Sequence, residues 1–372
     1  MLLANVYGRM AGTDVRVLTP QVPAERQAAG HIVVEPTAID GSLRGLRPLA
    51  ALAQHLRVAR QIRHNTRIRP SVMHCARPLP EGAAAFAARR VYRSTAPYVI
   101  WAHGEDLAAA ATSREHAWLA RLVCKDAAAV VANSHFTAAI VRRFGVESER
   151  IHVVHPGVDA MRFESMASPA ACDDRERVRL LSVGRLQRRK GHDIAIEAVA
   201  ALHADFPNLE YLIAGDGTER TRLERLAADR GVAGRVRFLG EVADEQLPEL
   251  YAGCDIFLMP NRTDGHDVEG FGIVFLEAAA AGRPTIGGRS GGVPEAIAEG
   301  ETGLVVDGSR VADVAEAIRA LACAPQRRRE MGAAGRARVL RSFTWEHASA
   351  RIQSLHEQVG IAGPEVQSIA VD

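Results

Sequence analysis

The segment Glu269-Gly-Phe-Gly-Ile-Val-Phe-Leu-Glu277 decides the fold, because it reads as a glycine turn that leads into an apolar helix. The first backbone N–H groups of such a helix have no partner within it and, with the helix dipole, attract an anion. Gly270 and Gly272 allow a ligand to approach the backbone closely. Carboxylates such as Glu269 and Glu277 accept hydrogen bonds from sugar hydroxyls, so the segment predicts a nucleotide-sugar site. The alternative is an ordinary turn with two surface glutamates.

A second signal lies upstream, where the apolar run Val178–Val183 predicts a buried strand. Two cations, Arg185 and Lys190, follow the carboxyl end of this strand. Ligands of open α/β sheets bind beyond the carboxyl ends of the strands, and two cations there can neutralise a diphosphate. The alternative is a solvated basic loop, which is how we interpret Arg188 and Arg189.

Short apolar runs alternate with helical patterns along the whole chain. This alternation is typical of βαβ units, with a parallel sheet covered on both faces, so we predict an α/β fold. Besides the strand already described, strands are expected at 15–18, 32–34, 72–74, 98–102, 129–132, 151–154, 211–214, 236–242, 255–260, 284–288 and 303–306.

These elements together resemble the retaining glycosyltransferases of family 4, whose fold is called GT-B: two Rossmann-like domains that face each other across a cleft. The resemblance extends from about residue 4 to 357, and residues 267–295 are most similar to the bacterial GDP-mannose-dependent phosphatidylinositol mannosyltransferases and lipid-linked polysaccharide mannosyltransferases. Besides the two-glutamate segment, the matching motifs are His103-Gly-Glu-Asp, Asn133-Ser134, the segment 150–159, Val183-Gly-Arg-Leu, Lys190-Gly-His and Gly215-Asp-Gly.

The resemblance implies a domain organisation. We expect an N-terminal acceptor-side domain at 1–160, a linker at 161–177 and a C-terminal domain at 178–343 that binds the nucleotide-sugar. A helix at 344–358 should cross back to the first domain, and 359–372 should be a loose tail.

The resemblance also implies what the chain does. It should move a hexose, with mannose favoured, from a nucleotide diphosphate sugar to a lipid-linked or glycan acceptor in the synthesis of envelope polysaccharide or glycolipid. The implied catalytic residues are Glu269, which holds the sugar, Arg185 and Lys190 at the leaving diphosphate, and His103 from the other domain. The implied donor-binding residues are Gly184, Arg185, Lys190, Gly215, Asp216, Val242, Phe271, Gly272, Ile273, Val274 and Glu277, the last at the ribose.

No cofactor and no metal ion are expected. An Asp-x-Asp metal motif is absent from a suitable place in the sequence, and GT-B enzymes generally work without one. Arg185 and Lys190 should therefore supply the positive charge that the leaving diphosphate requires.

The composition limits the other classes of function. The 372 residues suffice for two domains, and a net charge of +2 provides no field that would favour nucleic acid. The five scattered cysteines indicate reduced packing residues in a cytosolic protein. No apolar run approaches the roughly 20 residues of a membrane-spanning helix, and no signal peptide is evident, so a cytoplasmic location is expected.

One region is strongly basic. The segment from Arg44 to Arg69 contains seven arginines and no acid, and its leucines follow a partly helical spacing. Such a helix can lie on an anionic membrane, which would place the protein peripherally on the inner face of the plasma membrane. The alternative is an ordinary domain helix with a solvated basic face.

The N-terminus departs from the family pattern, since residues 1–10 already resemble the helix that follows the first strand and its glycine loop. We therefore expect that strand and loop to be missing, through a late start codon or a truncation. The other hypothesis is a degenerate, non-catalytic nucleotide-sugar-binding protein. Another GT-B enzyme, such as a sugar-nucleotide epimerase, also remains an alternative.

Overall fold

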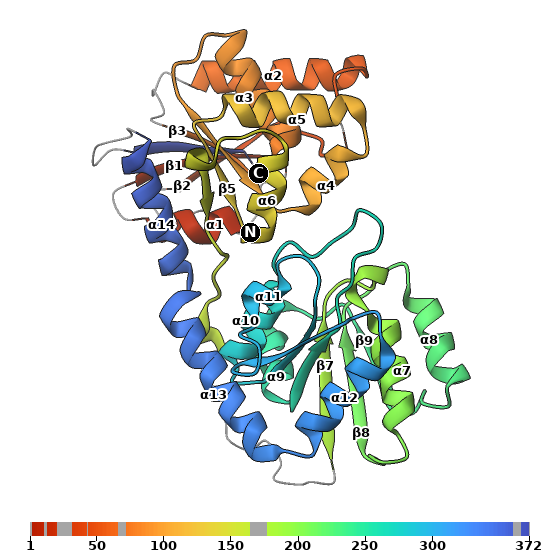
Figure 1. Ribbon diagram of the computed structural model, residues 1–372. Coiled ribbons are helices and arrows are strands. Elements are labelled where there is room, and N and C mark those ends of the chain that lie inside the picture. The colour runs from red at the N-terminus through yellow and green to blue at the C-terminus, as the bar shows by residue number, and fades with distance from the viewer. Residues whose placement is uncertain are drawn as a thin grey trace. The chain divides into compact units, whose positions relative to one another are not determined.

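The computed structural model describes residues 2–10, 13–20, 32–42, 44–65, 72–163, 177–359 and 366–371. The chain forms two compact units (Figure 1). The N-terminal unit comprises Met1–Pro156 together with Trp345–Asp372, and the C-terminal unit comprises Gly157–Thr344. Each unit is a parallel β-sheet covered by helices, so the prediction of an α/β fold with two Rossmann-like domains is confirmed.

The N-terminal unit is built around a seven-stranded sheet in the order β2-β1-β13-β3-β4-β5-β6, in which every pair is parallel. The strands are β1 (Thr13–Thr19), β2 (Ile32–Pro36), β3 (Val72–Cys75), β4 (Tyr98–Ala102), β5 (Ala129–Ala132), β6 (Ile151–Val153) and β13 (Val366–Val371). The helices are α1 (Leu2–Tyr7), α2 (Leu49–Asn65), η1 (Pro78–Gly82), α3 (Ala83–Arg90), α4 (Glu105–Ala111), α5 (Arg114–Asp126), α6 (His135–Arg143), η2 (Ser148–Arg150) and α14 (Trp345–Gln358).

Local sequence explains these elements. Strands β3, β4 and β5 are buried at every position, as expected for central strands with helices on both faces. Two of the helices start at a serine whose hydroxyl accepts a hydrogen bond from a backbone N–H of the first turn. Ser113 caps α5 in this way, and Ser134 caps α6.

Strand β13 is the unexpected member of this sheet. The sequence predicts a loose tail at 359–372, yet residues 366–371 pair in parallel with β1 on one side, where Val15 lies opposite Ser368, and with β3 on the other, where His74 lies opposite Ala370. The segment forms a strand because β1 and β3 would otherwise each present a row of unpaired backbone groups.

Helix α14 is joined to β3, within the N-terminal unit, by a buried pair of histidines. The Nε2 atoms of His74, in β3, and His356, in α14, lie 2.9 Å apart. Trp101 donates from its Nε1 to the Nδ1 of His74 at 3.2 Å, so the proton of His74 lies on Nε2 and is donated to His356. Burial lowers the pKa of both histidines, and that of His356 falls to about 4. Both rings are therefore neutral near pH 7.

The C-terminal unit has a six-stranded parallel sheet in the order β12-β11-β10-β7-β8-β9. Its strands are β7 (Val178–Val183), β8 (Leu209–Ala214), β9 (Val236–Gly240), β10 (Ile256–Met259), β11 (Thr285–Gly288) and β12 (Gly303–Val306). Its helices are η3 (Ala160–Phe163), η4 (Arg188–Lys190), α7 (His192–Leu202), α8 (Arg220–Asp229), η5 (Asp244–Gln246), α9 (Leu247–Ala252), α10 (Ile273–Ala280), α11 (Val293–Ala296), α12 (Val311–Ala322) and α13 (Pro325–Ser342).

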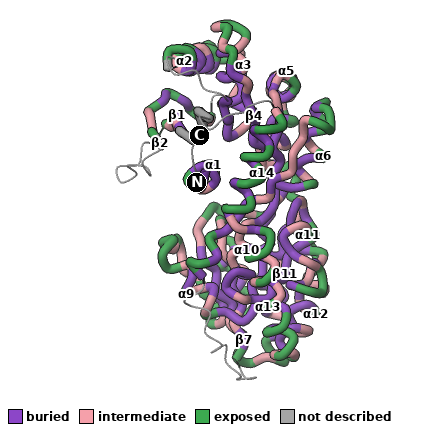
Figure 2. Tube along the Cα trace, turned by 90° about the vertical axis from the view of Figure 1, so that its left-hand side faces the viewer, coloured by how far each residue is buried: buried purple, intermediate pink, exposed green. Residues whose placement is uncertain are grey.

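Two apolar layers cover this sheet, one on each face. Leu180 and Ile256 belong to one layer, whereas their neighbours Leu181 and Phe257 belong to the other, as the alternation of side chains along a strand requires. Buried residues, purple in Figure 2, run through β11 and α10. The sheet therefore forms a rigid base for the loops at the carboxyl ends of its strands.

Other sequence-based predictions can be compared with the structure. Cys75, Cys124 and Cys254 are buried thiols, as expected, but Cys323 is exposed and is not a packing residue. Cys172 lies outside the described residues, as do Arg67 and Arg69 of the basic segment and most of the predicted linker. No helix in the described ranges has both the length and the apolar character to cross a membrane.

Candidate active site

The loop after β7 carries the cations that the sequence singled out. Arg185 is exposed at the start of the loop. Lys190, at its end in η4, is 8% exposed. Burial lowers the pKa of Lys190, and the positive charge of Arg185 adds a smaller contribution in the same direction.

Glu269 is the centre of a hydrogen-bonded cluster at the carboxyl edge of this sheet. Its Oε2 accepts from the Nζ of Lys190 at 2.5 Å, from the Nη1 of Arg189 at 2.6 Å and from the Nδ2 of Asn261 at 3.0 Å. The donors come from two loops, those after β7 and β10, and Glu269 lies just before α10. The structure thus brings together Glu269 and Lys190, which are 79 residues apart in the sequence.

The cluster is buried and ionised. The side chain of Glu269 is 13% exposed. Burial alone would raise the pKa of its carboxyl, but the charges of Lys190 and Arg189 together outweigh burial and lower it. The pKa of Lys190 is lowered, first by its burial, which Glu269 partly offsets. A carboxylate next to two cations therefore remains charged at neutral pH.

Arg189 corrects a prediction. The sequence suggests that it belongs to a solvated basic loop, but it is 5% exposed, and its Nε lies 2.9 Å from Oδ1 of Asp267. The adjacent Arg188 behaves as predicted, with 64% of its side chain exposed and 3.9 Å to Asp264. The pattern of residues does not distinguish two adjacent arginines, because the turn of η4 decides which one faces the interior.

The backbone of Glu269 is held by the glycine pair that follows β11. Gly292 donates from its N–H to the carbonyl oxygen of Glu269 at 3.0 Å. Gly291 has a φ of +56°, and a Cβ at this position would lie 1.8 Å from the same oxygen. No larger residue fits there, so these glycines allow the two loops to pack together.

Helix α10 begins at the place where the anion site is predicted. Gly272 precedes it with a φ of +89°, and Ile273 and Val274 are its first two residues. Their N–H groups lack acceptors within the helix, as at every helix start. Phe271 is 2% exposed and its ring packs 6.1 Å from that of Phe343, so its side chain belongs to the core. Phe271 can therefore contact a nucleotide-sugar through its backbone but not through its side chain.

Glu277 lies one turn further along α10. One of its oxygens, Oε2, accepts a hydrogen bond from the hydroxyl of Tyr251 in α9 at 2.7 Å. Burial raises the pKa of Glu277, and the hydrogen bond from Tyr251 opposes this. The two glutamates of the motif are thus shifted in opposite directions. The sequence offers no signal that would have identified Tyr251 as this partner.

The loops after β7 and β8 lie side by side. Gly184 donates to the carbonyl oxygen of Ala214 at 2.9 Å, and Leu186 donates to that of Asp216 at 2.9 Å. The carboxylate of Asp216 accepts from the N–H of Gly217 at 2.7 Å, which lowers its pKa. Three of the predicted donor-binding residues, Gly184, Gly215 and Asp216, therefore occupy one edge.

Val242 lines an open groove of about 460 Å³ next to β9. The groove has both apolar and charged walls. Its other lining residues are Arg179, Leu212, Leu239, Glu241, Gln246, Glu249, Leu250 and Gly253. This volume lies within the range of small-molecule sites.

His103 belongs to the N-terminal unit, where it follows β4. Its Nε2 lies 3.0 Å from the carbonyl oxygen of Ala76, so Nε2 carries the proton and Nδ1 is left as an acceptor. The backbone N–H of His103 lies 3.2 Å from each oxygen of Asp106, and Asn133 donates to its carbonyl oxygen at 3.3 Å. The loop is thus fixed from three sides.

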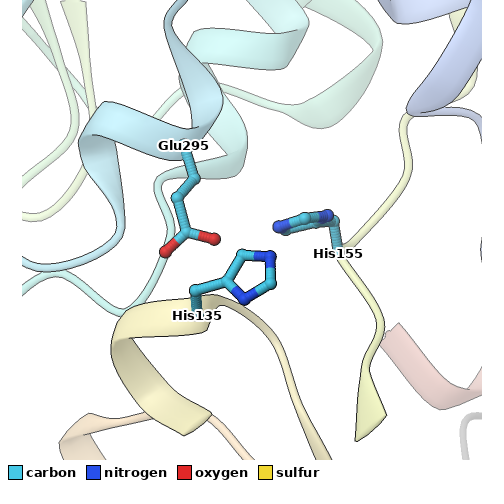
Figure 3. A group of neighbouring side chains, drawn as sticks. All are labelled: His135, His155 and Glu295. Atoms are coloured by element: carbon cyan, nitrogen blue, oxygen red, sulfur yellow. The ribbon is translucent and has the colours of Figure 1, made fainter. Parts of the chain in front are cut away.

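A second pair of histidines lies in the N-terminal unit. The rings of His135, at the start of α6, and His155 are 5.9 Å apart and inclined by 65° (Figure 3). Figure 3 also draws Glu295, which belongs to the C-terminal unit. Two histidines are fewer than the three or four ligands of a protein zinc site, so this pair by itself is not a metal centre.

Asn261 is a functional candidate that sequence reasoning missed, although a signal existed. It is 1% exposed and is the second residue after the carboxyl end of β10, with Pro260 between them. Polar residues at that edge of a parallel sheet are the ones that meet ligands.

Comparison with known families assigns both halves of the chain. The family described as Glycosyltransferase Family 4 matches residues 3–162, and the family described as Glycosyl transferases group 1 matches residues 172–338. The chain belongs to glycosyltransferase family 4. The resemblance expected from the motifs is therefore confirmed.

Relatives of this family-4 chain include mannosyltransferases. It is 39% identical over 244 residues to a GDP-mannose-dependent alpha-(1-6)-phosphatidylinositol monomannoside mannosyltransferase of Mycolicibacterium smegmatis, and the match covers 63% of each chain. The identity to the Mycobacterium tuberculosis protein of the same name is 43% over 206 residues, 53% of each chain. A D-inositol 3-phosphate glycosyltransferase of Rhodococcus opacus is 37% identical over 56% of this chain and 48% of that one. The chain thus matches between about half and two thirds of the length of these relatives.

Solved structures confirm the GT-B fold. Sucrose-phosphate synthase from Thermosynechococcus elongatus superposes with a TM-score of 0.77 at 21% identity, covering 97% of this chain and 92% of that chain. HepE from Anabaena, solved in complex with UDP and glucose, superposes with a TM-score of 0.74 at 19% identity, covering 92% and 99%. At these identities the likeness concerns the fold alone.

Proposed function

We propose that this family-4 chain is a retaining hexosyltransferase that uses a nucleotide diphosphate sugar, with GDP-mannose as the favoured donor. The observation that carries the proposal is the buried cluster in which Lys190 and Arg189 face Glu269 at the carboxyl edge of the C-terminal sheet. Ligands of such sheets bind at this edge. Two of the relatives described above are named as GDP-mannose-dependent enzymes, which favours the mannose donor.

The chemistry follows from where charge develops. Breaking the anomeric C–O bond leaves negative charge on the diphosphate, and preorganised cations and N–H groups stabilise it. Arg185 and Lys190 are assigned to this task, together with the backbone N–H groups of Ile273 and Val274. We assign the carboxylate of Glu269 to the sugar hydroxyls, because a charged, oriented acceptor fixes the donor pose.

The ribose and the base of the donor are each assigned to a separate element. We place the ribose at Glu277 and the base at Val242, which lines the groove beside β9. The donor is thus assigned to the C-terminal unit. The acceptor is assigned to the N-terminal unit, together with His103.

The acceptor is proposed to be lipid-linked or a glycan, used in envelope polysaccharide or glycolipid synthesis, as the names of the relatives suggest. The helix α2 supports a peripheral position on the cytoplasmic face of the plasma membrane. It carries no acid, Arg57, Arg60 and Arg63 are exposed on it, and Leu49 at its start is 81% exposed. Exposed arginines each contribute about 1 kcal/mol of attraction near an anionic surface.

Vesicle sedimentation tests this position. Replacing both Arg57 and Arg60 by glutamate should weaken binding to vesicles that contain anionic phospholipid by roughly tenfold or more. The matched control is Arg225→Glu, a charge reversal on the exposed face of α8. Equal binding of the double variant and the control would remove the membrane from the proposal.

A transfer assay decides the function. The purified chain is incubated with GDP-mannose, UDP-glucose, UDP-galactose or UDP-N-acetylglucosamine and a membrane lipid extract, and the radiolabelled sugar is followed into lipid. We expect transfer from GDP-mannose, unchanged by EDTA because Arg185 and Lys190 are assigned the charge-stabilising task. Binding without transfer or hydrolysis would favour the alternative of a non-catalytic nucleotide-sugar-binding protein. Isomerised donor without acceptor would favour an epimerase.

A further inference from the structure

Arg189 and Arg188 are neighbours with opposite surroundings. The guanidinium of Arg188 is in solvent, whereas that of Arg189 bridges Glu269, at 2.6 Å, and Asp267, at 2.9 Å. The main chain of Arg189 is also fixed, because its carbonyl oxygen accepts from the N–H of Arg262 at 2.9 Å. The loop after β10 therefore holds Arg189 in one orientation.

Among the described residues, the side-chain hydrogen bonds of Glu269 are all accepted by one carboxylate oxygen. Lys190, Arg189 and Asn261 all donate to Oε2. Within the described part of the chain, no hydrogen bond reaches Oε1. One oxygen is thus anchored, while the other remains available as an acceptor for a ligand hydroxyl.

Lys190 has two tasks under the proposed function. Its ammonium bonds Glu269 in the structure, and it is assigned to the leaving diphosphate. A diphosphate near Lys190 competes with Glu269 for this compact cation. Once Lys190 is shared, Glu269 keeps two donors, of which Asn261 is neutral and Arg189 is charged.

We propose that Arg189 is a positioning residue for the sugar contact: it is the cation that keeps Glu269 ionised and its Oε1 directed at the donor sugar while Lys190 serves the diphosphate. This inference rests on the proposed function. Arginine suits the role, because its guanidinium is always charged and its fork can hold Glu269 and Asp267 in a fixed geometry.

If Arg189 had only a structural role, its loss would have different consequences. Arg189 also ties the loop after β7 to that after β10, so its loss would lower thermal stability in either case. The charges that act on Glu269 are those of Lys190 and Arg189, while Asp267 pairs with Arg189 and Arg185 repels Lys190. Loss of Arg189 therefore leaves Glu269 easier to protonate, which a loss of packing alone would not do.

The experiment compares Arg189→Met and Arg189→Lys with the matched control Arg188→Met in the full-length chain. The first readout is the pH dependence of kcat/KM with the donor on which the wild type is active. We expect the acid limb of Arg189→Met to move upward by about one pH unit, because a nearby opposite charge lowers the pKa of a carboxyl by about 1–3 units. Arg189→Lys should retain most of the wild-type profile, and Arg188→Met all of it.

The second readout is calorimetric binding of GDP-mannose and of GDP. GDP lacks the mannosyl group that Glu269 is assigned to hold, so Arg189→Met should weaken the binding of GDP-mannose at least about tenfold more than the binding of GDP. An equal loss for both ligands, or an acid limb that stays in place, would overturn the inference while the proposed function stands. A wild type that neither binds nor transfers any nucleotide-sugar would overturn the proposed function, and this inference with it. If Arg189→Met does not fold, Arg189→Lys decides. A pH profile of kcat/KM like that of Arg188→Met, with an unchanged ratio of the affinities for GDP-mannose and GDP, supports a charge role. A variant that no longer binds GDP-mannose more tightly than GDP, as the wild type does, opposes it.

Discussion

Replacing Glu269 by glutamine keeps the size of the side chain and removes one charge from a cluster with two buried cations. Oε2 of Glu269 accepts at 2.5 Å from Lys190 and at 2.6 Å from Arg189. Hydrogen bonds to charged groups contribute about 1.5–3 kcal/mol each, against about 1 kcal/mol for neutral ones. Asp267 still pairs with Arg189 in the variant. We therefore expect the free energy of unfolding of the C-terminal unit to fall by about 3 kcal/mol, a large share of the 5–15 kcal/mol typical of a domain.

Urea unfolding measures this change, and Glu277→Gln is the matched control. Glu277 loses little, because burial raises the pKa of its carboxyl and an amide oxygen can still accept from Tyr251. The pKa of Glu269 is lowered, so its contribution is complete above the usual carboxyl pKa and is lost as the pH falls through the lowered value. The loss of stability that Glu269→Gln causes relative to the wild type should thus be constant from about pH 5.5 to 8. Equal losses of stability, or a loss below about 0.5 kcal/mol for Glu269→Gln, would refute the reasoning.

Three further predictions concern the histidine pair, the cations and the glycine turn. Burial lowers the pKa of His356 to about 4, so the contribution of this histidine to the free energy of unfolding of the N-terminal unit should be fully present above about pH 6.5. The free energy of unfolding should fall by about 2 kcal/mol as the pH is lowered to about 5. His356→Gln should reduce this pH dependence in urea titrations. Arg185→Ala and Lys190→Ala should each reduce kcat by roughly 10²-fold, and a double variant with wild-type kcat would exclude the charge-stabilising role. Gly291→Ala should lower the free energy of unfolding by about 2 kcal/mol more than Gly300→Ala, because both have a positive φ but the first alone meets a backbone oxygen.

The sequence was sufficient to predict elements that depend on local pattern. Strands such as Val178–Val183 are continuous apolar runs, and their positions fix a parallel sheet whose carboxyl edge collects Lys190 and the loop before α10. The opposite environments of Arg188 and Arg189 could not be predicted, because they depend on the direction of a single helical turn. The partner of Glu277 could not be predicted either, since Tyr251 belongs to a short helix with no motif of its own.

The largest departure from expectation is β13, and its reason is also physical. Residues 366–371 follow a helix and end the chain in a stretch where no family motif lies, so the sequence indicated a tail. The parallel partners β1 and β3 are more than 290 residues away along the chain, as Val15 and Ser368 illustrate. Pairing at such a distance depends on the open position in the sheet and not on any local signal.

The place of α14 and β13 has a consequence for synthesis on the ribosome. The sheet of the N-terminal unit contains the last strand of the chain between strands made near the beginning, so it cannot close until all of Gly157–Thr344 has been translated. At about 5–20 residues per second, this interval lasts on the order of ten seconds or more. The C-terminal unit is one continuous segment and can fold first. During that interval the backbone edges of β1 and β3 lack the partner that β13 provides, which makes intermolecular strand pairing a hazard specific to this stage of synthesis.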